Sequence, residues 1–158
     1  MADAQFLREA VELAGLERLE GPPAPDQVAA LRANLAAQEA PDLDRATFFV
    51  LDEEFHRLLL GLSGHAGSWP AVATAKGHLD RARMLALRTD RPLSVYVREH
   101  RNVFEAALAG QIDLARQRLR SHLRTVFSDI EDIRRDHPEL FAADPDAVPT
   151  RKTVAVWA

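Results

Sequence analysis

The sequence contains no cysteine, which excludes disulfide bonds and thiolate metal ligands. Any bound metal would therefore need nitrogen and oxygen ligands. No stretch reaches 18 uninterrupted apolar residues, so we expect no membrane-spanning helix. The chain has 20 basic and 24 acidic residues, and this balance is atypical of a free-standing DNA-binding module. Together these absences favour a globular, cytoplasmic protein.

Between clear glycine and proline breaks, apolar residues recur at intervals of three and four, as in amphipathic helices. The pattern predicts helices over residues 3–20, 25–39, 43–63, 69–87, 92–109 and 112–135. Asp42 or Asp44 is expected to cap the third helix, and Pro92 to occupy the first position of the fifth. The short connections favour antiparallel neighbours. We therefore predict an all-α antiparallel bundle of six main helices over residues 1–141, followed by an extended or disordered tail over 142–158.

Four polar residues interrupt the apolar stripes of three predicted helices: Asp52, His56, His100 and His122. Asp52 and His56 are four residues apart and so project from one helix face. Burying such groups is costly unless they are compensated. One aspartate and three histidines form a donor set for a divalent metal, with zinc preferred and nickel, manganese or iron as alternatives. The competing interpretation is that each histidine is a hydrogen-bonded core residue.

A metal site also raises the possibility of an enzyme. The sequence lacks the His-Glu-x-x-His arrangement that places a general base beside a metal. Glu53 and Glu54 lie next to Asp52 but are expected to point away from its face and to be solvated. No phosphate-binding glycine loop or nucleophile motif is present. We therefore predict a protein that is not an enzyme.

The segment Asp52-Glu53-Glu54-Phe55-His56, with Leu62-Ser63-Gly64 after it, resembles a block of the FCD domain. This is the effector-binding domain of the FadR subfamily of GntR-type transcriptional regulators. Glu99-His100-Arg101, His122-Leu123 and the pair Arg8 and Glu12 resemble further blocks of the family. The resemblance covers about residues 4 to 128.

The resemblance implies an all-α bundle in which Asp52, His56, His100 and His122 bind the metal. It also implies a small organic acid as effector, such as a sugar acid, a hydroxy acid or a dicarboxylate. Arg8 and Arg83 are candidate partners for the effector carboxylate. His65 stands where family members usually carry asparagine and is a candidate ligand-binding residue. A homodimer is expected, with DNA contacted only through a winged-helix domain that is absent from this chain.

Three functions compete at this point. The first is a metal-dependent sensor of an organic acid that controls DNA binding. The second is a metal-dependent enzyme acting on a small carboxylate, which the missing general base disfavours. The third is a helical dimerisation module with buried histidines and no ligand.

Overall fold

A computed structural model describes residues 2–76, 80 and 92–136 of the chain. The described residues form six α-helices and no strand, which confirms the prediction of an all-α fold. The helices are α1 (Ala2–Glu17), α2 (Pro25–Gln38), α3 (Arg45–Gly61), α4 (Trp69–Ala75), α6 (Leu93–Leu108) and α7 (Ile112–Asp136). A 3₁₀ turn, η1 (Ala66–Ser68), precedes α4. The predicted fourth helix extended to residue 87, and most of its second half lies outside the described residues, as does the predicted tail.

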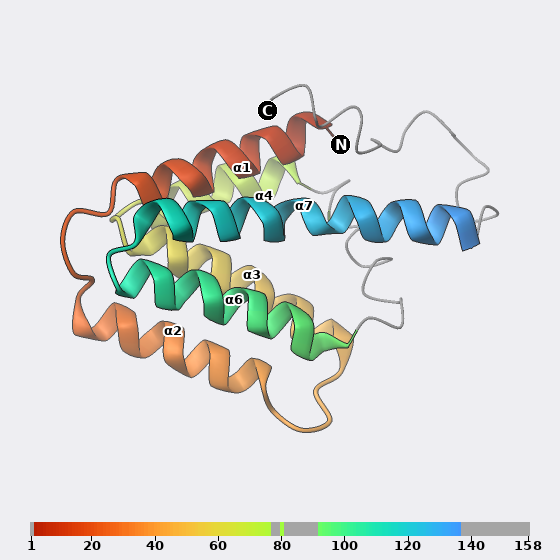
Figure 1. Ribbon diagram of the computed structural model, residues 1–158, viewed down its shortest axis with the longest axis horizontal. Coiled ribbons are helices and arrows are strands. Elements are labelled where there is room, and N and C mark those ends of the chain that lie inside the picture. The colour runs from red at the N-terminus through yellow and green to blue at the C-terminus, as the bar shows by residue number, and fades with distance from the viewer. Residues whose placement is uncertain (1, 77–79, 81–91, 137–158) are drawn as a thin grey trace.

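Helix α7 is the longest helix and runs between α1 and α6 before extending beyond the rest of the bundle (Figure 1). It packs against both of these helices, while α3 packs against α1, α2 and α6. The central core joins these elements through fully buried apolar side chains. These include Leu31, Phe55, Val103, Ala115 and Leu119. Helices α1, α2, α3, α6 and α7 thus share one hydrophobic interior.

Two helix ends are set by local chemistry. Oδ1 of Asp44 accepts hydrogen bonds from the backbone N–H groups of Ala46 and Thr47, both at 2.9 Å, so Asp44 rather than Asp42 caps α3. At the end of α6, Gly110 has φ of 71°, and the N–H of Gln111 donates to the carbonyl of Ala106 at 2.9 Å. This glycine-terminated cap reverses the chain so that α7 returns antiparallel to α6.

The prediction for Pro92 was wrong by one residue. Pro92 has ψ of 138° and is the N-cap, and α6 begins at Leu93. Its extended backbone lies outside the helix, although its fixed φ would also have suited a first helical position.

Helices α1 and α3 approach each other closely at Gly15. A Cβ atom at Gly15 would lie 2.5 Å from Cδ1 of Leu60, so the glycine leaves room for the leucine. Gly15 lies about one turn from Glu12, and Leu60 lies one turn from His56. The close contact between Gly15 and Leu60 therefore holds Glu12 of α1 near His56 of α3.

Candidate metal centre

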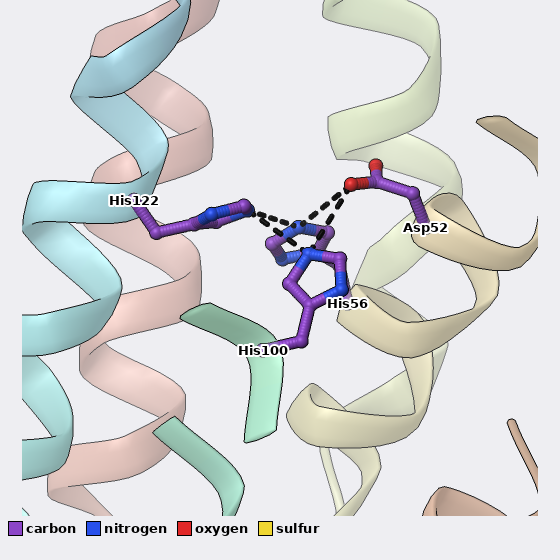
Figure 2. Close-up of side chains that lie close together, drawn as sticks. All are labelled: Asp52, His56, His100 and His122. Atoms are coloured by element: carbon purple, nitrogen blue, oxygen red, sulfur yellow. Dashed lines mark hydrogen bonds and ion pairs between the residues drawn. The ribbon is translucent and has the colours of Figure 1, made fainter. Parts of the chain in front are cut away.

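The four predicted metal ligands lie together in the interior of the bundle. Asp52 and His56 come from α3, His100 from α6 and His122 from α7 (Figure 2). All four residues are buried, and one potential ligand atom from each lies within 4.8 Å of the others. The structure thus brings together, from three helices, the set chosen from the sequence.

The spacing of the inward-facing atoms matches the ligand shell of a single ion. Nε2 of His122 lies 3.1 Å from Nε2 of His100 and 3.3 Å from Nε2 of His56. Oδ1 of Asp52 lies 3.2 Å from Nε2 of His100 and 3.9 Å from Nε2 of His56. Ligands bound at about 2.0–2.1 Å to a tetrahedral ion lie roughly 3.3 Å from one another. The four atoms could hold a divalent metal with little rearrangement.

Each imidazole is held by an acceptor on its outer nitrogen. Nδ1 of His56 lies 2.6 Å from Oε2 of Glu12, Nδ1 of His100 lies 2.8 Å from Oε1 of Gln38, and Nδ1 of His122 lies 2.8 Å from Oε2 of Glu99. An acceptor at Nδ1 requires that this nitrogen carries the proton, which leaves a lone pair on Nε2. Three Nε2 lone pairs therefore face one another. Without a cation, this arrangement is electrostatically unfavourable.

The orientation of the Gln38 amide follows from a chain of hydrogen bonds that ends at a backbone carbonyl. Nδ2 of Asn34 donates to the carbonyl oxygen of Leu51 at 3.0 Å, and Nε2 of Gln38 donates to Oδ1 of Asn34 at 2.7 Å. The carbonyl can only accept, so both amides are fixed in direction. Oε1 of Gln38 must then face His100, which fixes the tautomer of that histidine.

Burial keeps His56 and His100 neutral, as metal ligands must be. Burial lowers the pKa of His100 to about 3, with His122 acting in the same direction and Asp52 opposing it. Burial also lowers the pKa of His56. For Glu12, burial raises the pKa, but His56 and Arg8 together outweigh it and lower the value to about 2. The centre thus combines two imidazoles held neutral, His56 and His100, with the ionised supporting carboxylate of Glu12.

Aromatic rings fix the imidazoles from the sides. The ring of Phe55 is stacked on His100 with centroids 4.2 Å apart and an interplanar angle of 17°. The ring of Trp69 is parallel to His56 at a centroid distance of 6.4 Å. This packing limits rotation of the two rings and preorganises the centre.

Arg8 lies beside the centre on α1 and is almost fully buried. Its Nε donates to Oε1 of Glu12 at 2.7 Å, and the other oxygen of Glu12 holds His56. Nη2 of Arg8 is buried and has no hydrogen-bond partner among the described residues. The predicted carboxylate partner is therefore close to the centre and retains a free donor.

The two other predicted ligand-binding residues are placed differently. His65 is exposed in the turn between α3 and η1 and is not part of the cluster. The exposure of the His65 side chain gives its candidate ligand-binding role no support. Arg83 lies outside the described residues.

The neighbouring acidic residues are engaged by cations. Glu54 and Arg57 form a half-exposed ion pair, in agreement with the expected solvation of Glu54. Glu53 instead forms an ion pair with the buried Lys76, so the expectation that Glu53 is solvated was wrong. Lys76 comes from the residue after α4, a tertiary contact that helical periodicity within α3 does not reveal.

Sequence reasoning gave no role to three residues that support the centre: Glu12, Gln38 and Glu99. Gln38 carried no signal beyond being a glutamine at the end of a helix. Glu99 lies directly before His100 in the sequence, yet it contacts His122 of the next helix. Only the packing of α1, α2 and α6 brings these acceptors to the imidazoles.

Comparison with known families matches residues 3–125 of the chain to the FCD domain. The chain belongs to the FCD domain family. This confirms the resemblance drawn from the Asp-x-x-Phe-His and Glu-His segments. Within the described part of this FCD domain, no helix is both long and apolar enough to cross a bilayer.

Two curated relatives are transcriptional regulators by name. An uncharacterized HTH-type transcriptional regulator in an unstable DNA locus of Streptomyces ambofaciens is 52% identical over 99% of this chain. The HTH-type transcriptional repressor RspR of Escherichia coli is 26% identical over 90% of the chain. The aligned regions cover 66% and 63% of these relatives, so the chain spans about two thirds of their length. The match to the FCD domain and the naming of both relatives as transcriptional regulators point to a regulatory protein, as predicted, rather than to an enzyme.

Proposed function

We propose that this FCD domain is the sensing part of a GntR/FadR-type transcriptional regulator, in which a divalent metal and a small organic acid control DNA binding. Asp52, His56, His100 and His122 are the proposed metal ligands. Zinc is the first candidate because the site combines imidazole and carboxylate donors, and nickel, manganese and iron are the alternatives. The observation that carries the proposal is the convergence of three Nε2 lone pairs on one point. Each is fixed by an acceptor on the opposite ring nitrogen.

The charges of the buried groups favour an anionic effector. Asp52 and Glu12 each carry one negative charge and Arg8 carries one positive charge, and all three are at least 96% buried. A divalent cation among them would leave this buried set with one net positive charge. Because an uncompensated charge is costly in a protein interior, a monoanion beside the cation is favoured.

The effector carboxylate has a matching donor. When bound, the metal would supply a Lewis-acidic anchor for one carboxylate oxygen. The free Nη2 of Arg8 would donate to the carboxylate, and Glu12 would hold the guanidinium in place through Nε. Arg8 thus orients the acid, while Glu12 links the acid-binding arginine to the metal-binding His56.

The signal would pass to DNA through a part of the regulator outside this chain. The relatives are named HTH-type regulators and are longer than the aligned region, which supports a winged-helix DNA-binding domain in the whole protein. We propose that the regulator acts as a homodimer, with residues 1–141 as the effector-binding domain and residues 142–158 as a tail.

Metal binding tests the proposal. The domain is stripped with a chelator and titrated with zinc, nickel and manganese by calorimetry, alongside His100→Ala, His122→Ala and the control His65→Ala. We expect the wild type and His65→Ala, whose altered side chain is exposed, to bind one ion per chain. The other two variants should lose at least about a hundredfold in affinity because each removes a ligand. No binding by the wild type, or unchanged binding by both ligand variants, would contradict the proposal and favour a dimerisation module.

A further inference from the structure

Two buried polar atoms on α1 lack hydrogen-bond partners among the described residues: Nη2 of Arg8 and Oε1 of Gln5. The two side chains are 2% and 1% exposed, so bulk water does not solvate these atoms. Buried polar atoms are nearly always paired in folded proteins. An unpaired donor and an unpaired acceptor three residues apart on one helix therefore indicate a missing polar partner.

Gln5, Arg8 and Glu12 lie on one face of α1, because residues three, four and seven apart in a helix share a face. This face is turned toward the metal centre. Glu12 contacts His56 at 2.6 Å, and Nε2 of Gln5 donates to the carbonyl oxygen of Leu123, the residue after His122, at 3.1 Å. The two unpaired atoms thus occupy the face of α1 that contacts the metal-binding helices α3 and α7.

The direction of the Gln5 amide is fixed by that backbone carbonyl. The carbonyl oxygen of Leu123 can only accept, so Nε2 must face it and Oε1 must face away. If the amide turned over, two oxygens would face each other without a proton. The free atom of Gln5 is therefore an acceptor and requires a donor.

Gln27 shows the usual state of such a side chain in this protein. Its Nε2 donates to the carbonyl of Gly61 at 2.8 Å, and its Oε1 accepts from the backbone N–H of Ala24 at 3.1 Å. Both ends of the Gln27 amide are satisfied, although Gln27 is less buried than Gln5. The unsatisfied end of Gln5 is thus not a general property of the glutamines that bond a backbone carbonyl.

We propose that Gln5 is a specificity-determining residue whose Oε1 accepts a hydrogen bond from a hydroxyl group of the effector. The inference rests on the proposed function, in which the effector is an acid anchored by Arg8. It narrows the effector to a monocarboxylate that carries a hydroxyl, a class that includes hydroxy acids and sugar acids.

Effector groups other than a hydroxyl fit Oε1 of Gln5 less well. A second carboxylate would place an anionic oxygen against the acceptor, and it would overcompensate the single positive charge of the buried set. An unsubstituted acid would leave Oε1 unpaired. An ammonium group would donate to Oε1, but it would lie near the Arg8 guanidinium and the metal cation. A neutral hydroxyl satisfies the acceptor without any of these costs.

The test measures affinities of the zinc-loaded domain for acids that differ by one hydroxyl. The pairs are lactate and propanoate, 3-hydroxybutanoate and butanoate, and gluconate and hexanoate. Each is titrated against the wild type, Gln5→Met and the matched control Gln27→Met. The comparison across variants is needed because a 2-hydroxyl can also contact the metal directly.

We expect the wild type and Gln27→Met to prefer the hydroxylated member of at least one pair. In Gln5→Met this preference should fall about tenfold, the worth of one buried hydrogen bond, while affinity for the unsubstituted acid stays within about twofold. A preference that is unchanged in Gln5→Met would overturn the role of Gln5 and leave the proposed function standing. If the wild type binds zinc but none of the six acids, the acid-sensing function itself is contradicted.

A second measurement needs no variant and applies if Gln5→Met does not fold. In 2-methoxypropanoate the hydroxyl oxygen of lactate is retained but its proton is replaced by a methyl group. We expect the zinc-loaded wild type to bind it at least about tenfold more weakly than lactate, because Oε1 of Gln5 has lost its donor. Equal affinities would overturn the inference.

Discussion

Glu12 holds Nδ1 of His56 at a distance of 2.6 Å across 44 residues of sequence. The same carboxylate accepts from Nε of Arg8 at 2.7 Å. One buried residue of α1 therefore fixes both a proposed metal ligand and the proposed anchor of the effector. The carboxylate of Glu12 therefore couples effector binding at Arg8 directly to the metal centre.

Removal of Glu12 should strongly destabilise the metal-free domain. Glu12→Ala leaves the buried guanidinium of Arg8 without a counter-charge, which typically costs about 3–5 kcal/mol. The double variant Arg8→Met, Glu12→Leu removes both charges and should recover most of this loss. Urea unfolding followed by circular dichroism measures both. If Glu12→Ala were as stable as the wild type, the Arg8–Glu12 pair would not be a desolvated ion pair.

Glu99 should tune metal affinity with little effect on folding. Its Oε2 holds Nδ1 of His122, and its side chain is 27% exposed, so replacing it leaves no fully buried charge. Loss of such a supporting acceptor lowers metal affinity by about 10- to 100-fold. Competition with a chromophoric chelator compares Glu99→Ala with Glu105→Ala, an exposed glutamate of the same helix. Equal zinc affinities for the two variants would show that Glu99 does not support the centre.

The metal-free domain should lose stability as the pH falls below about 6.5. The pKa of His100 is lowered by burial to about 3, so the unfolded chain binds a proton in this range that the folded chain does not. The stability that neutral His100 contributes is therefore fully present above the pKa of histidine in the unfolded chain. It falls by roughly 1 kcal/mol per pH unit between pH 6.5 and pH 3. Glu12, with a pKa of about 2, adds to the loss below 4.5. Urea midpoints at pH 7.5, 6.5 and 5.5 measure the trend, and His100→Gln should flatten it. A wild-type midpoint independent of pH would contradict the buried, neutral state of His100.

The start of α3 depends on the Asp44 cap. Asp44→Ala removes the acceptor for the N–H groups of Ala46 and Thr47 and should lower the melting temperature. Asp44→Asn keeps a side-chain oxygen at this position and should retain most of the stability. Thermal unfolding by circular dichroism compares the two, and equal losses for both variants would indicate that charge rather than capping matters here.

The fold and the four proposed metal ligands could be predicted from the sequence because both follow from the helical periodicity of the apolar residues. Asp52 and His56 are four apart, and His100 and His122 occupy apolar stripes, so helix geometry alone directs all four inward. The acceptors that hold Nδ1 of each histidine could not be predicted in this way. Gln38 and Glu99 act on histidines of other helices, and their roles depend on how the helices pack. Likewise, the helical periodicity of α3 predicted that Glu53 is solvated, whereas in the structure it forms an ion pair with Lys76.

The central claim is that three imidazoles and one carboxylate hold a single metal ion. X-ray absorption at the zinc edge of the zinc-loaded domain tests it most directly. The account predicts three imidazole nitrogens and at least one oxygen at about 2.0–2.1 Å, falling to two imidazoles in His122→Ala. A coordination shell of oxygen alone, or a shell that keeps three imidazoles in His122→Ala, would contradict it.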